Sequence, residues 1–132
     1  MSLQATPIYF VFQNETCKLL LQYEYFPNFC PTGPVLVTPE DIEDVQNLNM
    51  WLDVNGERKQ TGNTDKMIFD VRTIVHHLSQ YSQLEPGDLI LTGTPPGVGM
   101  GMNPPQYLKP GDVVTLGIEG LGEQSQTVVK EA

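Results

Sequence analysis

Hydrophobic and polar positions follow two different periods along the chain. The helical period is clearest over residues 70–82, where apolar side chains recur about every 100° around a helical wheel. This stripe consists of Val71, Ile74, Val75, Leu78 and Tyr81. Asp70 is a favourable N-cap residue just before it. We therefore predict one main helix over residues 70–82.

Strand-like runs separated by turn signals occupy most of the remaining chain. Residues 48–54 alternate and end in Asn55-Gly56, a strong hairpin signal. The return strand, residues 57–60, is charged, which indicates an exposed edge. Val35 to Val37 form a short apolar run that predicts another strand, and residues 8–12 and 18–21 predict a hairpin in the lead-in.

A turn-strand unit then repeats. Residues 85–88 (EPGD) precede the apolar run 89–92, and residues 109–112 (KPGD) precede the run 113–116. Pro-Gly favours a type II turn, in which glycine takes the position with positive φ. A last strand is expected over residues 124–129. Many short strands with one helix and no βαβ alternation predict an α+β fold with a mixed or antiparallel sheet.

Acidic residues cluster after the short run at 35–37. Thr38 and Pro39 are typical of a helix start, so the acids that follow are explained by the positive end of one helical turn over residues 40–44. The cluster consists of Glu40, Asp41, Glu43 and Asp44. Closely spaced carboxylates also suit Mg²⁺ or Ca²⁺, but the helix-start pattern already accounts for them.

Composition narrows the class of partner. The chain has 132 residues, 16 acidic against 7 basic side chains, and a formal net charge of −9. This length fits one domain or a piece of a larger one. Nucleic acids and anionic membrane surfaces both attract clustered Lys and Arg, so neither is expected as a partner. No apolar stretch is long enough to span a bilayer, and no secretory leader is recognised.

Histidine and cysteine do not form a metal-ligand pattern. A zinc site needs about four Cys, His or carboxylate ligands at characteristic spacing, whereas His76 and His77 are adjacent and Cys17 and Cys30 stand apart. On the helical wheel His76 lies opposite the apolar stripe and His77 on its flank, so both are interpreted as partly exposed helix residues. Reduced, inert cysteines are expected, which favours a cytoplasmic location, with mitochondria as the alternative.

The stretch 92–99 (TGTPPGVG) is the main candidate for ligand binding. Thr92 and Thr94 lie two residues apart, so on a strand both hydroxyls would face one side of the sheet. Gly93 between them allows backbone N–H groups to approach a ligand closely. A carboxylate or enolate oxygen suits such donors. The alternative is a stiff corner in which the threonines bond to local backbone.

Other stretches carry weaker signals. Residues 61–69 form a polar loop that is either a second candidate site or ordinary Gly, Asn and Asp turn chemistry. No serine nucleophile elbow, Cys–His pair or spaced carboxylate dyad is found. From the residues alone, no catalytic group is identified.

An ordered set of short strings closely resembles the C-terminal part of the fumarylacetoacetate hydrolase family, from about residue 26 to residue 129. The nearest branches are the short fumarylacetoacetate hydrolase domain-containing proteins and the hydroxyhepta-dienedioate isomerases. The strings are FCPTGP at 29–34, VNGE at 54–57, GNT at 62–64, MIF at 67–69, PGDLILTGTPPGVG at 86–99, PP at 104–105, LKPGD at 108–112 and IEGLG at 118–122.

The resemblance implies a mixed β-sheet roll with a barrel-like centre, here incomplete, and a homo-oligomer, usually a dimer. It implies hydrolase, lyase or isomerase chemistry on small β-dicarbonyl or 2-oxo acids, such as acylpyruvates. In the family, Mg²⁺ or Ca²⁺ chelates substrate oxygens and stabilises an enolate. The second threonine of the Thr-Gly-Thr string, here Thr94, helps to hold the substrate.

The chain departs from the family before residue 29. The family's metal ligands, a Glu-x-Glu pair and a later Asp, and its catalytic His–Glu pair precede the FCPTGP string. In this sequence the only acidic residues upstream of that string are Glu15 and Glu24. Residues 1–25 are therefore interpreted as a divergent lead-in and residues 26–132 as the C-terminal part of a catalytic domain, with no metal ligand identified.

Two functions follow. The chain is either part of such an enzyme, inactive unless another polypeptide segment supplies the metal ligands, or a non-catalytic remnant that serves as a dimerisation or interaction domain. An unrelated small-molecule binding module is a third interpretation.

Overall fold

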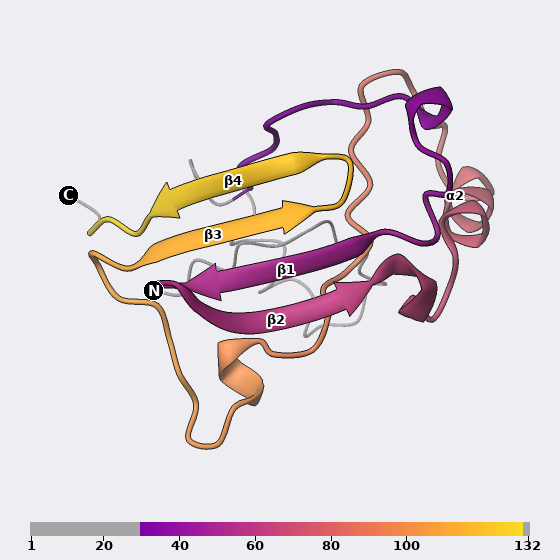
Figure 1. Cartoon of the computed structure of the whole chain (residues 1–132). Helices are drawn as coiled ribbons and strands as arrows, with labels where there is room; N and C mark the ends of the chain where they lie inside the picture. Colours follow the sequence, from indigo (N-terminus) through magenta and orange to yellow (C-terminus); the bar gives the residue numbers. More distant parts are fainter. Residues whose placement is uncertain (1–29, 131–132) are drawn as a thin grey trace.

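The computed structural model describes residues 30–130, which form one open antiparallel sheet beside one helix (Figure 1). The strands are β1 (Asn49–Val54), β2 (Glu57–Asn63), β3 (Val113–Ile118) and β4 (Gly122–Thr127), in the order β2-β1-β3-β4. Of the two arrangements expected, mixed or antiparallel, the described sheet is antiparallel. It does not close into a barrel, in agreement with the incomplete roll expected from the sequence.

The predicted hairpin at Asn55-Gly56 is confirmed. Asn55 and Gly56 have φ values of 53° and 79°, the two left-handed positions that a type I′ turn requires. Beyond the turn the register changes, because Val54 and Asp53 pair with Glu57 and Arg58, whereas Leu52 pairs with Gln60. Lys59 is the extra residue of a β-bulge, and such a bulge bends its strand and re-aims its side chains. In Figure 1, β2 is visibly curved.

The core is small and is formed by residues of β1, the start of β3 and the segment just after β4. Leu52, Val114 and Val128 are its buried apolar residues, at 9%, 3% and 5% exposure, and Leu108 and Leu116 pack against them. Gln60 is the buried polar residue of the described chain, at 5% exposure. Its place opposite Leu52 puts a side-chain amide beside an apolar core, where it needs hydrogen-bond partners.

The helix α2 (Val71–Ser79) confirms the main helix, but it ends three residues earlier than predicted. The Asp70 carboxylate accepts a hydrogen bond from the Thr73 N–H at 2.6 Å, as an N-cap should. After Ser79 the chain closes in a turn, in which the N–H groups of Tyr81 and Ser82 both donate to the Leu78 carbonyl. No residue of α2 is buried, so the apolar stripe is only partly covered by residues 30–130.

Two predicted strands are wrong. Residues 35–37 form no strand, and Leu36 is 99% exposed. Residues 89–92 form only a single bridge at Leu91. An apolar run becomes a strand only where a neighbouring backbone pairs with it over several residues. Within the described residues, run 35–37 has no such pairing and run 89–92 is bridged at Leu91 alone. The turn expected over 40–44 is a 3₁₀ helix, Pro39–Asp41, and the Thr38 hydroxyl donates to the Asp41 carboxylate instead of capping the backbone.

Both Pro-Gly turns form as predicted. Gly87 and Gly111 have φ values of 103° and 97°, and the N–H groups of Asp88 and Asp112 donate to the carbonyls of Glu85 and Lys109, each at 3.0 Å. Each aspartate carboxylate also accepts the N–H of the first turn residue, at 2.8 Å for Asp88 and 2.7 Å for Asp112. Only the second turn leads into a strand, β3.

Asp112 also joins its turn to the β1–β2 hairpin. Its carboxylate accepts a hydrogen bond from the Asn55 side-chain NH₂ group at 2.9 Å, and the Asn55 side-chain oxygen Oδ1 accepts from the Val113 N–H at 2.9 Å. The hydrogen bond from Asn55 and, to a smaller extent, the one from the Lys109 N–H hold the pKa of the Asp112 carboxyl below its usual 3.8. Because these contacts favour the ionised form, the stability they add is present above pH 3.8 and is lost as the pH falls through the lowered pKa.

We expect Asp112→Ala to destabilise the chain more than Asp88→Ala. Both substitutions remove the same turn contact, but only the first releases Asn55 and the start of β3. Urea unfolding at neutral pH measures the difference, and it should shrink under acid conditions, where Asp112 of the parent chain is protonated. Equal destabilisation by the two variants at neutral pH would contradict the role given to Asn55.

Candidate functional site

A cavity of about 630 Å³ opens between the sheet and the segment that follows the Thr-Gly-Thr string. Leu52, Val54 and Val114 form its apolar floor. Its opposite wall is formed by residues 97–100 and 105–109, which include the first two residues of the 3₁₀ helix η3 (Gly99–Gly101). Thr94 and Gln60 contribute polar groups to the lining. A concave, largely apolar site with a few placed polar groups is the usual form of a small-molecule site.

Thr94 is held in this cavity by Gln60. The Gln60 Nε2 atom donates to the Thr94 hydroxyl oxygen at 2.8 Å and to the Pro95 carbonyl at 2.6 Å. These two bonds use both amide hydrogens and satisfy the buried donor. The strand β2 is thereby fastened to the loop through the one residue of β2 that is buried.

The loop also contacts β2 through its backbone. A β-carbon at Gly97 would lie 2.0 Å from the Lys59 carbonyl oxygen, and one at Gly62 would lie 2.5 Å from the Pro95 ring. Gly97 has in addition a φ of 111°, which side chains rarely adopt. A β-carbon at Gly99 would lie 1.8 Å from the Gln106 carbonyl oxygen. Gly97 and Gly99 of the TGTPPGVG string are therefore needed for close backbone packing.

The cavity carries charges of both signs. The Lys59 ammonium lies 2.8 Å from the Glu57 carboxylate and 3.4 Å from the Gln106 side-chain oxygen. Lys109 and Asp112 line the same space. The positive charge of Lys59 is therefore already paired with Glu57.

Of the predicted ligand-binding residues, the structure brings Thr94 to the cavity. Thr92 and Gly93 precede it on a segment that forms no strand beyond Leu91, and neither lies among the cavity-lining residues. Gly93 has a φ of 111°, so the chain turns between the two threonines. The expected sharing of one sheet face by Thr92 and Thr94 is wrong for this reason.

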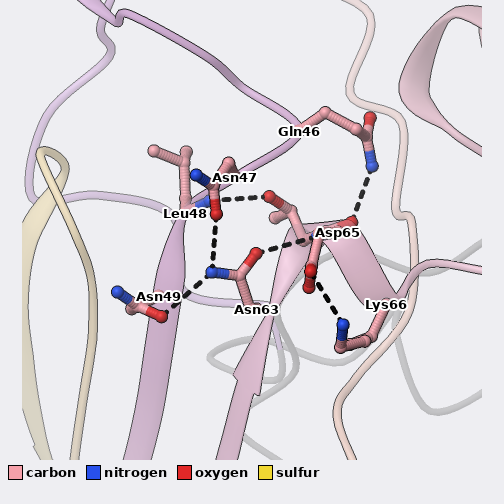
Figure 2. A network of polar contacts seen from close by, with 8 residues as sticks. Gln46, Asn47, Leu48, Asn49, Asn63, Asp65 and Lys66 are labelled. Atoms are coloured by element: carbon pink, nitrogen blue, oxygen red, sulfur yellow. Dashed lines mark hydrogen bonds and ion pairs between the residues drawn. The ribbon is translucent and has the colours of Figure 1, made fainter.

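In the second candidate, residues 61–69, polar side chains form hydrogen bonds that stabilise the local turns. Figure 2 shows Asn63 in a network in which its side-chain oxygen accepts the Asp65 N–H at 2.9 Å, while its amide donates to Asn47 and Asn49, both at 3.0 Å. Gln46 donates to the Thr64 carbonyl at 2.6 Å, and its side-chain oxygen accepts the Val71 N–H at 3.0 Å. These bonds link the ends of β1 and β2 to the start of α2.

The described residues do not fit a divalent cation. Within residues 30–130, no three acidic, histidine or cysteine side chains converge so as to hold a metal ion. The four acids at 40–44 are exposed and form no such group. His76 is exposed on α2, with its Nε2 2.9 Å from the Gln80 amide, and the His77 ring lies 5.0 Å from the Tyr81 ring. The predictions for residues 8–12, 18–21 and Cys17 fall outside the described part of the chain.

Gln60 was missed by the reasoning from sequence. The charged strand 57–60 indicates an exposed edge, and among the strands of residues 30–130 β2 does lie at the edge of the sheet. The bulge at Lys59 nevertheless puts Lys59 and Gln60, which are consecutive, against the same cavity. The sequence signal for a buried strand residue is the alternation of apolar and polar side chains. A bulge interrupts this alternation, so the pattern could not show that Gln60 is buried.

The chain belongs to the fumarylacetoacetate hydrolase family. The family model described as Fumarylacetoacetate (FAA) hydrolase C-terminal matches residues 11–129, which confirms the resemblance seen in the ordered strings. Among curated relatives, the chain is 58% identical over 101 residues to 2,4-didehydro-3-deoxy-L-rhamnonate hydrolase of Sphingomonas sp. (strain SKA58). This alignment covers 76% of the chain and 35% of that relative, so the chain spans about a third of its length.

Solved structures agree with this assignment. Fumarylacetoacetate hydrolase from Exiguobacterium antarcticum matches with a TM-score of 0.77 and 45% identity, over 80% of this chain and 38% of that one. Maleylpyruvate hydrolase from Sphingobium sp. SYK-6, in complex with manganese(II) and pyruvate, matches with a TM-score of 0.71 and 34% identity, over 79% and 37% of the two chains.

In the described part of this chain, no helix combines the length and apolar character needed to cross a membrane.

Proposed function

We propose that residues 30–130 form the substrate-binding side of a hydrolase, lyase or isomerase site for small 2-oxo or β-dicarbonyl acids, such as acylpyruvates. The observation that carries the proposal is the cavity in which Thr94 is fixed beside a glycine-rich loop. A hydroxyl and close backbone suit a carboxylate or an enolate oxygen. A related structure that holds manganese and pyruvate supports this class of substrate.

Metal dependence is part of the same proposal. The family resemblance implies Mg²⁺ or Ca²⁺, and the related maleylpyruvate hydrolase structure contains manganese. The described residues supply no set of carboxylates for such an ion. We therefore place the metal ligands outside residues 30–130 and expect this 132-residue chain by itself to be inactive. A cytoplasmic location remains the expectation.

The alternative function is a dimerisation or interaction domain without chemistry. It is favoured by the large apolar side chains that residues 30–130 leave exposed, including Leu36 at 99%, Ile68 at 92% and Tyr81 at 73%. Such surfaces favour association with other chains. A homo-oligomer is expected under either function, so ligand binding and not association separates the two.

Pyruvate is the probe that tests the proposed site. In a ¹⁵N-resolved NMR titration, we expect the backbone amides of Thr94 and Gly97, which both line the cavity, to shift with added pyruvate. Thr94→Val, which keeps the side-chain shape and removes the hydroxyl, should weaken binding about tenfold, because a hydrogen bond to a charged group is lost. Thr38→Val is the matched control, since Thr38 lies outside the cavity lining. Equal affinity in Thr94→Val and the parent chain would favour the non-catalytic alternative.

A further inference from the structure

The buried amide of Gln60 determines more than the position of the loop. Its Nε2 atom faces both the Pro95 carbonyl at 2.6 Å and the Thr94 hydroxyl oxygen at 2.8 Å. A carbonyl can only accept a hydrogen bond, so the amide must direct its NH₂ group, and not its oxygen, toward this pair of atoms. The Thr94 oxygen therefore accepts from Gln60.

A hydroxyl that accepts from an amide keeps its own proton for another acceptor. Within residues 30–130 the Thr94 hydroxyl donates to no protein group, and Thr94 lines the cavity. We propose that Gln60 is a positioning residue that holds the Thr94 hydroxyl as a hydrogen-bond donor toward an anionic oxygen of the ligand. This inference rests on the proposed function, because it assigns a partner and a direction to the same threonine.

The surroundings of Gln60 make this orientation durable. The side chain is only 5% exposed, so water cannot readily replace either bond. Gln60 pairs with Leu52 in the ladder, and the Lys59 bulge beside it brings the adjacent Gly97 backbone against β2. Donors fixed before the ligand arrives bind more strongly, since no reorganisation is needed at that moment.

The same arrangement predicts how the site selects its ligand. A hydroxyl held as a donor favours a carboxylate or an enolate oxygen over a ligand that offers only N–H or O–H donors. Acetamide, which also has an oxygen acceptor but no charge, should bind more weakly than acetate.

A double-mutant cycle tests the role of Gln60 with pyruvate as the ligand. Gln60→Met keeps the approximate length of the side chain and removes both donors, and in the parent chain it should weaken pyruvate binding about tenfold. In the Thr94→Val background the same substitution should change the affinity less than about twofold, because Gln60 acts on the ligand only through the hydroxyl. A purely structural role would give the same effect in both backgrounds.

A second variant guards against loss of folding in Gln60→Met. Gln60→Glu keeps the shape but replaces the NH₂ group by an acceptor, so the Thr94 hydroxyl should turn to donate to the introduced carboxylate and pyruvate binding should again fall. The Gln60 side-chain amide signals of the parent chain should also show slow hydrogen exchange that becomes faster in Thr94→Val.

The outcomes separate the two proposals. Weak binding in Thr94→Val with parent-like binding in both Gln60 variants would overturn the positioning role and leave the proposed function standing. Parent-like binding in Thr94→Val, or no pyruvate-induced shift in the parent chain, would overturn the proposed function and this inference with it. Equal effects of Gln60→Met in the two backgrounds would show a structural role alone.

Discussion

Gly97→Ala should destabilise the chain by about 2–6 kcal/mol, a large share of the 5–15 kcal/mol typical of a folded domain. Two costs add at this position. A φ of 111° is strained for any residue with a β-carbon, at about 1–3 kcal/mol. The new carbon would also meet the Lys59 carbonyl oxygen at 2.0 Å, and relief of such overpacking costs about 1–3 kcal/mol. Denaturant unfolding of the two proteins measures the difference.

Gly111→Ala is the matched control. Gly111 has a similar φ of 97°, but a β-carbon there would have no neighbour within 4 Å. It should therefore lose only the conformational part, about 1–3 kcal/mol. If Gly97→Ala and Gly111→Ala proved equally stable, the close contact between the TGTPPGVG loop and β2 would not exist in solution. The loop would then not form a wall of the proposed cavity.

The second large effect concerns metal. We expect calorimetric titration of the 132-residue chain with Mg²⁺ to show no saturable binding, and an acylpyruvate with Mg²⁺ added to show no turnover. The described residues bring no three potential ligands together, and the 28 residues before Phe29 contain only Glu15 and Glu24 as acids. A dication without several anionic oxygens gains too little to replace its hydration shell.

A variant controls for diffuse attraction by the acidic surface. In it, Glu40, Asp41, Glu43 and Asp44 become their amides. If weak Mg²⁺ uptake is seen, it should fall in this variant and in high salt, because exposed charges are screened. Micromolar affinity that survives the substitutions would contradict the prediction and would show that carboxylates of this chain form a true site.

Short sequence patterns predicted several elements of the fold correctly. Asn55-Gly56 specified a hairpin through two left-handed positions, and both did take positive φ. Asp70 and the apolar stripe after it specified the helix, because capping and periodicity are properties of neighbouring residues. The Pro-Gly turns formed for the same reason. The strands predicted at residues 35–37 and 89–92 did not form, because a strand also needs a partner backbone. No local pattern in the sequence shows whether such a partner is present.

The sequence by itself determined the family, the turns, the helix start and the candidate loop with Thr94. Each of these depends on residue identity within a short stretch, or on an ordered set of such stretches. The tertiary structure alone decided that Gln60 is buried and bonded to Thr94, that Thr92 does not line the cavity, and that Gly97 must lack a side chain. The physical reason is the bulge at Lys59: a one-residue change of register reverses which side chains face the core, and it arises from pairing between strands rather than from the residues of one strand.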